Sequence, residues 1–503
     1  MLFNSSIFIL GFLPLTLLIF WLLSKFRLTQ GVMIWLLLSS LFFYSYWNIF
    51  APAGQGQTIQ YIILIVLSIV INHQLGSAIA SAPLSSPKAK LLLFLGTCLN
   101  LGVIVYYKYA NFLLGSFNHI FASNYNLGQL ILPLGISFYT FTQIAYLVDA
   151  YRGEIKEENY ELPTYGLFIL FFPQLIAGPI LRHDELIPQF RRLRNFIFSS
   201  KNLALGLTLF SLGLSKKVII ADTLSPWVGT IFAHANSLTF IEAWVGALSY
   251  TLQLYFDFSG YSDMAIGLGL MFNIILPINF DSPYKSLSII EFWRRWHITL
   301  SNFLRDYLYI PLGGSRRGEI RRYTNLIVTM LLGGLWHGAG WTFVVWGGLH
   351  GLYLSINHGW KKLNITFPKW LAWIITFLAV VMGWVIFRAQ NLSDGLTMIQ
   401  TMIGINGITL PGEAQGKLSF LSSLGIQLQS WSKFNYLPEF YGQKNLSILI
   451  LFVLVLGVVK LPNSQEIMEK IKFKSWWALV LGLLMTYCLL SLNRVSEFLY
   501  FQF

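Results

Sequence analysis

The sequence predicts an all-α, polytopic membrane protein with about 11–13 transmembrane helices and re-entrant or interfacial segments. Of its 503 residues, 55% are hydrophobic and only 11% are charged, whereas about a quarter of residues are charged in soluble proteins. Apolar runs of roughly twenty residues, each able to cross a hydrocarbon core of about 30 Å, recur along the chain. We therefore predict a single integral-membrane domain that occupies residues 1–503.

The basic residues, 34 Lys and Arg against 21 Asp and Glu, lie in short clusters between apolar runs. This is the positive-inside pattern of membrane proteins, in which basic loops are cytoplasmic. The clusters do not form a basic domain of their own, so we expect the lipid bilayer, and no nucleic acid, as a partner. Both cysteines, Cys98 and Cys488, lie within apolar runs, and no disulfide framework is predicted.

The first apolar run, residues 1–23, has no preceding positive charge and is followed by Lys25 and Arg27. We interpret it as a retained first helix rather than a cleaved signal peptide. An uncharged outer loop is predicted at 51–58, and a long extracytoplasmic loop at 389–444. Further helices are predicted at about 32–49, 59–78, 91–107, 203–220, 238–256, 323–337, 341–357, 367–387, 446–460 and 475–492, with another crossing before Asp149.

The run that begins at Tyr165 departs from this alternation, because basic residues make both of its ends look cytoplasmic. Pro173, Gly178 and Pro179 interrupt helix hydrogen bonding within it. A re-entrant segment explains this pattern. An ordinary kinked helix that ends in a basic outer loop is the alternative.

Two histidines stand out in residues 291–341. His297 lies between Lys285 and Arg305 in an aromatic and basic segment that we predict to be interfacial, because a spanning helix would bury arginines at its middle. His337 lies fifteen residues after Arg322, about 22 Å along a helix and so beyond mid-membrane. Three small residues follow His337 and allow a break in the helix.

An imidazole with an ordinary pKa of about 6.5 is suited to proton abstraction near neutral pH, and burial favours its neutral form. His337 is therefore a candidate general base, although a packing role is the alternative for a lone histidine in the membrane. The other six histidines lie near predicted helix ends or loops: His73, His119, His183, His234, His350 and His358. His297 and His337 have no third ligand nearby, and we expect no metal.

Acidic and hydroxyl side chains form a polar face in another apolar run, which contains Asp257, Ser259, Ser262 and Asp263 together with Gln253. Such residues either bond neighbouring helices or take part directly in catalysis. The sequence has no serine-hydrolase elbow, no Walker-type loop and no HExxH zinc helix. Serine hydrolysis, nucleotide hydrolysis and zinc proteolysis therefore have no support from motifs.

Five stretches are specific enough to indicate a family: FFPQLIAGPI at 171–180, FDFSGYSDMAIGLGLMF at 256–272, EFWRRWHITLSNFLRDYLYIPLGG at 291–314, LLGGLWHGAGWTFVVWGGLHG at 331–351, and the terminal YFQF. In these stretches the chain resembles the membrane-bound O-acyltransferase family. The resemblance is greatest to the bacterial branch that includes alginate and peptidoglycan O-acetyltransferases. It covers nearly the whole chain, and residues 389–444 are the least informative part.

The resemblance implies a shell of helices around a central channel in the inner (plasma) membrane. It also implies transfer of an acyl group from a cytoplasmic thioester such as acetyl-CoA to a hydroxyl of an extracytoplasmic polysaccharide, directly or through a partner acetyltransferase. No permanently bound cofactor is expected. His337 is then the general base and His297 orients or polarises the thioester. Substrate-binding residues are predicted at Arg294, Arg295, Trp296, Trp336, Asp257 and Ser259.

Three alternatives remain open from the sequence. Within the family, the chain could transfer D-alanine from a carrier-protein thioester to teichoic acid. Buried Asp and His residues also suit a transporter or a proton-coupled channel. A membrane scaffold that recruits an extracytoplasmic partner through its outer loop is the third, but it leaves the buried histidine unexplained.

Overall fold

The computed structural model describes residues 1–50, 59–128, 130–155, 160–176, 178–412, 419–471, 474–492 and 499. The predicted outer loop at 51–58 and the terminal motif at 500–503 lie outside these residues, as does part of the predicted loop at 389–444. Within the described residues the elements are helices, apart from two short strands. This confirms the predicted all-α class.

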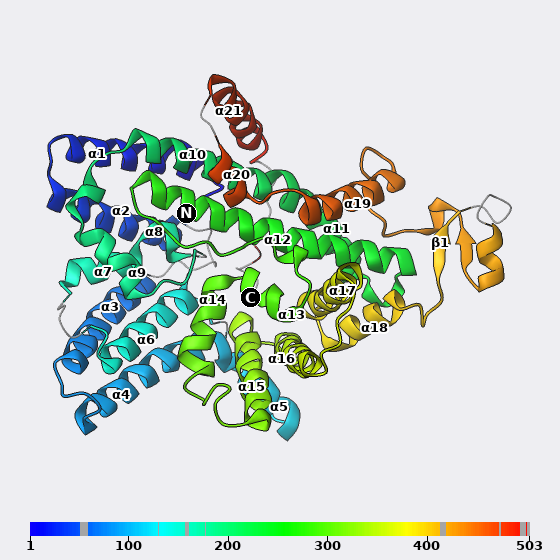
Figure 1. Cartoon of the computed structure of the whole chain (residues 1–503), viewed down its shortest axis with the longest axis horizontal. Helices are drawn as coiled ribbons and strands as arrows, with labels where there is room; N and C mark the ends of the chain where they lie inside the picture. The colour runs from blue at the N-terminus through cyan, green and yellow to red at the C-terminus, as the bar shows by residue number, and fades with distance from the viewer. Residues whose placement is uncertain are drawn as a thin grey trace. The chain divides into compact units, whose positions relative to one another are not determined.

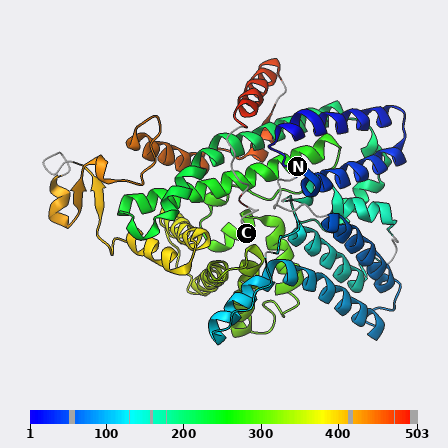
Figure 2. The ribbon, with the colours of Figure 1, turned by 180° about the vertical axis from the view of Figure 1, so that it is seen from behind.

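The chain forms two compact units, and the first comprises Met1–Leu214, Tyr261–Ile278 and Phe473–Leu492. In this unit α3, α4 and α6 pack side by side, as Figures 1 and 2 show. Its helices are η1 (Ile7–Phe12), α1 (Leu13–Lys25), α2 (Thr29–Phe50), α3 (Ile59–Ala80), α4 (Pro87–Ile104), η2 (Val105–Tyr109), α5 (Ala110–Phe121), α6 (Ile136–Arg152), α7 (Leu162–Leu170), α8 (Phe172–Leu175), α9 (His183–Arg191), η3 (Leu193–Phe196), α10 (Ser200–Ser215) and α21 (Ser475–Leu490).

The second unit comprises Ser215–Gly260, Asn279–Lys472 and Asn493–Phe503. Its helices are η4 (Lys216–Ala221), α11 (Asp222–Ala233), η5 (Ala235–Ser237), η6 (Pro283–Lys285), α13 (Ile289–Arg295), α14 (Ile298–Leu304), η7 (Arg305–Tyr309), α15 (Glu319–His337), α16 (Trp341–Lys362), α17 (Lys369–Arg388), α18 (Leu392–Met402), η8 (Ser419–Leu424), η9 (Trp431–Lys433), α19 (Lys444–Lys460) and α20 (Ser464–Lys470). One further helix, α12 (Phe240–Met271), contributes residues to both units.

Five helices in the described part of the chain are long and apolar enough to cross a membrane: Ile7–Lys25, Ile59–Ala80, Pro87–Phe121, Ser200–Ala233 and Lys369–Arg388. The bent pair of α19 and α20 makes a sixth if it counts as one span. The chain is therefore a multi-pass membrane protein. The larger number of 11–13 crossings and the central channel stay predictions.

Two predicted helix boundaries are wrong, because polar residues do not end these helices. The helix predicted at 238–256 continues through Asp257 and Asp263 to the end of α12 at Met271. The helix predicted at 203–220 continues past Lys216 and Lys217 to Ala233. Both continuations place ionisable side chains inside a helix, and several of these side chains neutralise one another, as described below.

The run with Pro173, Gly178 and Pro179 is broken, as predicted from its helix-breaking residues. It contains α7 with nine residues and α8 with four, and nine helical residues extend only about 14 Å, less than half of a hydrocarbon core. Residue 177 lies outside the described residues. Whether both ends face the cytoplasm stays a prediction.

Residues 389–444 contain more structure than a simple connector. The segment begins with α18 and includes the strands β1 (Thr409–Pro411) and β2 (Gln427–Gln429), which pair in parallel with Thr409 opposite Gln427. Its location outside the cytoplasm stays a prediction.

The α15–α16 hairpin determines where His337 lies, and Figure 1 shows the two helices side by side. Glycines allow the close approach, because a Cβ at Gly347 would overlap the carbonyl oxygen of Met330 on the facing helix. After His337 the chain is extended at Gly338, where a Cβ would overlap the ring of Phe343. This confirms the break that was predicted after His337.

Candidate active site

His297 lies at the junction between two short helices of the second unit. α13 and α14 have seven residues each, which is about 10 Å of helix and too short to cross a membrane. The interfacial segment predicted here is therefore not a continuous spanning helix. His297 itself has φ 44° and ψ 55°, in the left-handed region, which costs a non-glycine residue about 1 kcal/mol or more.

A network around Asn279 fixes the tautomer of His297. The Oδ1 atom of Asn279 accepts hydrogen bonds from the backbone N–H of Thr299 at 3.2 Å and from its Oγ1 at 3.0 Å. A backbone N–H can only donate, so the Asn279 atom that faces it is the carbonyl oxygen. Nδ1 of His297 lies 3.2 Å from the same oxygen and must therefore carry a proton that it donates.

This assignment leaves Nε2 of neutral His297 with a lone pair. Nε2 is buried and has no hydrogen-bond partner among the described residues. Burial lowers the pKa of His297 to about 3, because desolvation disfavours the charged ring. Near neutral pH, His297 therefore presents a hydrogen-bond acceptor rather than a donor.

His337 is the last residue of α15 and faces His297. The two ring centroids are 6.5 Å apart. The ring of Trp336 lies beside both, 6.1 Å from His297 and 4.9 Å from His337. His337 keeps 8% of its surface exposed and His297 keeps none, so both residues are buried and His337 is the less enclosed of the two.

Aromatic rings enclose His337 on its other sides. Trp346 and Phe387 meet its ring edge to face, with centroids 5.2 and 5.4 Å away. The ring of Phe258 meets the ring of His297, also edge to face, with centroids 4.7 Å apart. The two imidazoles thus share a buried, largely apolar site in which electrostatic and hydrogen-bonding interactions are strong.

A third histidine, His350, lies behind Trp346, and the sequence interpretation was wrong about its position. We predicted it near a helix end, but it is fully buried within α16. Nε1–H of Trp293 donates to its Nδ1 at 3.1 Å, and its ring lies 4.9 Å from that of Trp346. The sequence indicates this position only through the four-residue spacing between Trp346 and His350, since residues four apart share one face of a helix.

The predicted substrate-binding residues of the basic segment have different environments. Arg294 is exposed at the end of α13. Arg295 forms ion pairs with Glu291 at 3.0 Å and Asp281 at 3.6 Å. Trp296 is buried and stacks on neighbouring aromatic rings. Of these three residues, Arg294 is the one that the structure leaves available for a ligand at the surface.

Asp257 belongs to a buried ion cluster rather than to the histidine pair. Its Oδ1 lies 2.5 Å from Nζ of Lys217, which also lies 2.9 Å from Oδ1 of Asp222. Its Oδ2 accepts a hydrogen bond from the backbone N–H of Leu499 at 3.2 Å. Ser259, two residues later, is buried, and its Oγ has no hydrogen-bond partner among the described residues. The cluster therefore accounts for the burial of Asp257 through charge neutralisation.

In the first unit, Asp149, Glu154 and His183 have ligand atoms within 4.8 Å of one another. The guanidinium of Arg182 lies 2.6 Å from Glu154 and 3.6 Å from Asp149. A cationic side chain thus already interacts with two of the three groups that a metal cation would need. We interpret this cluster as an ion-pair network.

Comparison with known proteins shows the family of this chain. The sequence profile of the membrane-bound O-acyltransferase family matches residues 153–393, a range that contains both His297 and His337. The peptidoglycan O-acetyltransferase of Helicobacter pylori is 42% identical over 100% of this chain and 98% of its own. This chain belongs to the membrane-bound O-acyltransferase family. It is an acyltransferase, which excludes the transporter and scaffold alternatives as complete descriptions.

Other relatives distinguish the branches of the family. The probable alginate O-acetylase AlgI of Pseudomonas aeruginosa is 45% identical over 80% of this chain and 75% of its own. The teichoic acid D-alanyltransferase of Streptococcus thermophilus is 31% identical over 48% of this chain and 60% of its own. The similarity is thus greater and more extensive to the O-acetyltransferases.

Proposed function

We propose that this protein transfers an acetyl group from a cytoplasmic thioester such as acetyl-CoA to a hydroxyl of an extracytoplasmic polysaccharide. The proposal places the protein in the inner (plasma) membrane and allows the acetyl group to pass directly or through a partner protein. The observation that carries it is the pairing of His297 and His337, whose rings lie 6.5 Å apart in one buried site. No group other than the substrates is needed for this chemistry.

In the proposed reaction, His337 accepts the proton of the attacking hydroxyl. The hydroxyl oxygen forms a bond to the thioester carbonyl carbon, and the tetrahedral intermediate collapses by breaking the carbon–sulfur bond. The protonated ring then returns its proton to the departing sulfur, so that an ester and a thiol leave the site. His337 suits this role because it retains exposed surface and because a neutral imidazole can both accept and return a proton.

His297 has a different part in the proposal. Because its Nδ1–H donates to Asn279, neutral His297 cannot polarise a carbonyl through Nε2, which has only a lone pair. Nε2 can instead accept a hydrogen bond from a hydroxyl or an amide N–H of a bound substrate. Two roles were expected for His297. The tautomer favours orientation of the substrate over polarisation of the thioester carbonyl.

The relatives guide the choice of substrates. The O-acetyltransferases named for peptidoglycan and alginate match most of this chain, so we propose a cell-wall or exported polysaccharide as the acceptor. The more limited match to a D-alanyltransferase makes D-alanyl transfer the competing outcome rather than the proposal.

Membrane vesicles that contain the protein, supplied with acetyl-CoA labelled in the acetyl group, test the proposal. We expect alkali-labile label in the polysaccharide fraction with wild-type protein, and its loss with His337→Gln, which should remain in the membrane at normal abundance. His119→Gln is the matched control, because His119 is exposed near the end of α5 in the other unit. Labelling only by a D-alanyl carrier protein, or full activity of His337→Gln, would contradict the proposal.

A further inference from the structure

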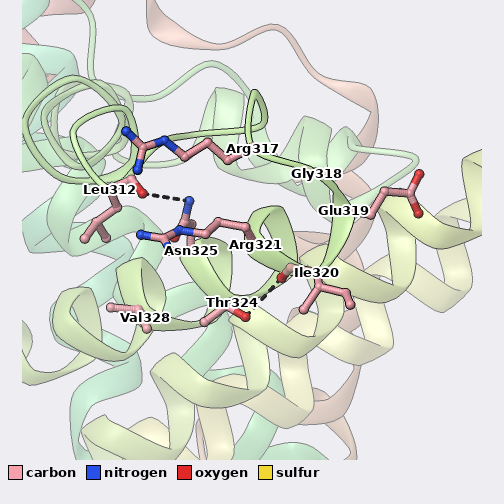
Figure 3. Close-up of a pocket in the computed structure, with 9 residues that line it drawn as sticks. All are labelled: Leu312, Arg317, Gly318, Glu319, Ile320, Arg321, Thr324, Asn325 and Val328. Carbon is pink, nitrogen blue, oxygen red and sulfur yellow. Dashed lines mark hydrogen bonds between the residues drawn. The ribbon is translucent and has the colours of Figure 1, made fainter.

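A cavity in the second unit is lined by the loop that precedes α15 and by the start of this helix. Its volume is about 770 Å³, and residues of the loop and of the first three turns of α15 line it (Figure 3). Arg321 and His337 are sixteen residues apart on α15, about 24 Å along the helix axis. This cavity, which we call the arginine pocket, is therefore separate from the histidine site.

Two guanidinium groups give the arginine pocket its charge. Arg317 and Arg321 extend over the same hollow in Figure 3, and neither has an ion-pair partner among the described residues. The acid among the lining residues, Glu319, forms an ion pair with Lys362 of α16 and points away from the two arginines in Figure 3. The pocket therefore has a net positive charge and is suited to an anion.

The loop holds Arg317 close to its backbone. A Cβ at Gly313 would lie 3.0 Å from Cδ of Arg317, so the glycine leaves the space in which the arginine stem packs. Gly313 also has φ 111°, a conformation that other residues rarely adopt. The stem of Arg317 thus packs against the backbone at Gly313, whereas the neighbouring Arg316 does not line the pocket.

Apolar side chains line part of the pocket, and they distinguish a lipid phosphate from a free phosphate as its occupant. Leu312 and Val328 line it together with Ile320, whose side chain is 85% exposed. At a lipid interface basic groups meet headgroups and apolar groups meet acyl chains, so a lining that combines two arginines with apolar side chains is suited to a molecule with both an anionic and an apolar part. A free phosphate would use the arginines and leave this wall without a partner.

We propose that the arginine pocket binds the phosphate headgroup of an anionic phospholipid and that its apolar wall contacts the lipid chains. Phosphates accept paired hydrogen bonds from guanidinium groups. The loop before α15 is basic and is predicted to be cytoplasmic, and basic clusters on that side of a membrane are suited to anionic lipid headgroups. The proposal gives this lipid no part in acetyl transfer, because the pocket lies about 24 Å from His337 along α15.

The full-length protein in neutral detergent tests this inference, with dioleoylphosphatidylglycerol and dioleoylphosphatidylcholine as probes and native mass spectrometry as the measurement. We expect the wild-type protein to bind the anionic lipid at least about tenfold more tightly than the zwitterionic lipid, and R317Q/R321Q to lose most of that preference. R316Q is the matched control, since it removes one positive charge from the same loop but outside the pocket. It should retain the preference to within about twofold.

Three results would overturn the inference. The first is an unchanged lipid preference in R317Q/R321Q, and the second is an equal loss in R316Q, which would indicate a diffuse charge effect. The third is displacement of the lipid by soluble coenzyme A, with weaker coenzyme A binding in R317Q/R321Q, which would assign the pocket to a soluble phosphate. If R317Q/R321Q does not fold, R317K/R321K, which keeps the charge but loses the planar fork, should show a reduced but measurable preference.

Discussion

At the scale of single residues, the partner of an imidazole determines what the ring can do. Asn279 holds His297 in one tautomer through a hydrogen bond of 3.2 Å, while Thr299 fixes the orientation of the Asn279 amide. The sequence identified both histidines, but their proximity depends on the way the chain folds between residues 297 and 337. Asn279 could not be predicted, because its role depends on a contact with a residue eighteen positions later, beyond η6 and α13.

Replacement of Asn279 by Ala should release the tautomer of His297. We expect acetyl transfer to fall at least roughly tenfold, the lower end of the range seen when the partner that orients a metal-ligating histidine is removed. Thr299→Val is the control, because it removes one hydrogen bond to Asn279 but leaves the His297 contact. Steady-state rates of both variants in membranes, normalised to protein abundance, provide the measurement. Equal rates in the two variants would contradict the tautomer account.

At the scale of helices, buried charges and close packing explain where the sequence interpretation failed. A polar face centred on Asp257 suggested a break after residue 256, but Lys217 neutralises this carboxylate and α12 continues to Met271. A sequence shows the charges but not their pairing. The predictions around His337 were correct, because the small residues that follow it indicated where α15 ends and α16 begins.

Replacement of Lys217 by Met should leave Asp222 and Asp257 buried without a cation. Removing one partner of a buried ion pair costs about 3–5 kcal/mol, so thermal unfolding of the purified protein should occur at a clearly lower temperature. Lys201→Met is the control, because Lys201 is an exposed lysine near the start of α10. A similar loss of stability in both variants would show that the cluster contributes nothing specific.

Replacement of Gly347 by Ala should push α15 and α16 apart, because the new Cβ would overlap the carbonyl oxygen of Met330. We expect a loss of about 1–3 kcal/mol of stability and a lower acetylation rate, since His337 lies at the end of the displaced helix. Gly359→Ala on the same helix is the control, because the nearest atom to its Cβ would be 3.9 Å away. Normal unfolding and activity of Gly347→Ala would rule out the requirement for close approach.

At the scale of the whole molecule, the sequence predicted the all-α class and a multi-pass membrane protein, because hydrophobic length is a local property of the chain. The family could also be recognised from motifs. The number of crossings and the path of substrates through the protein depend on how distant segments meet, which hydrophobic length does not specify. The proposed reaction requires a donor from one side of the membrane and an acceptor from the other.

Cysteine labelling in intact cells tests this arrangement. In a protein with Cys98→Ser and Cys488→Ser, an impermeant maleimide should label Ser432→Cys, which lies in the predicted outer segment. It should label Ser315→Cys, in the basic loop, only after the membrane is permeabilised, because basic loops are cytoplasmic. Both positions are exposed, so access to the side chain is not limiting. Labelling of both from the same side would contradict the predicted topology.

The central claim is that His297 and His337 form one acyl-transfer site, and a double-mutant cycle tests it most directly. Single-turnover acetyl transfer is measured for wild type, His297→Ala, His337→Ala and the double variant. Residues that act as a unit give strongly non-additive losses, so the double variant should be little slower than His337→Ala alone. Losses that multiply, or a nearly normal rate for His337→Ala, would show that the two rings do not work together.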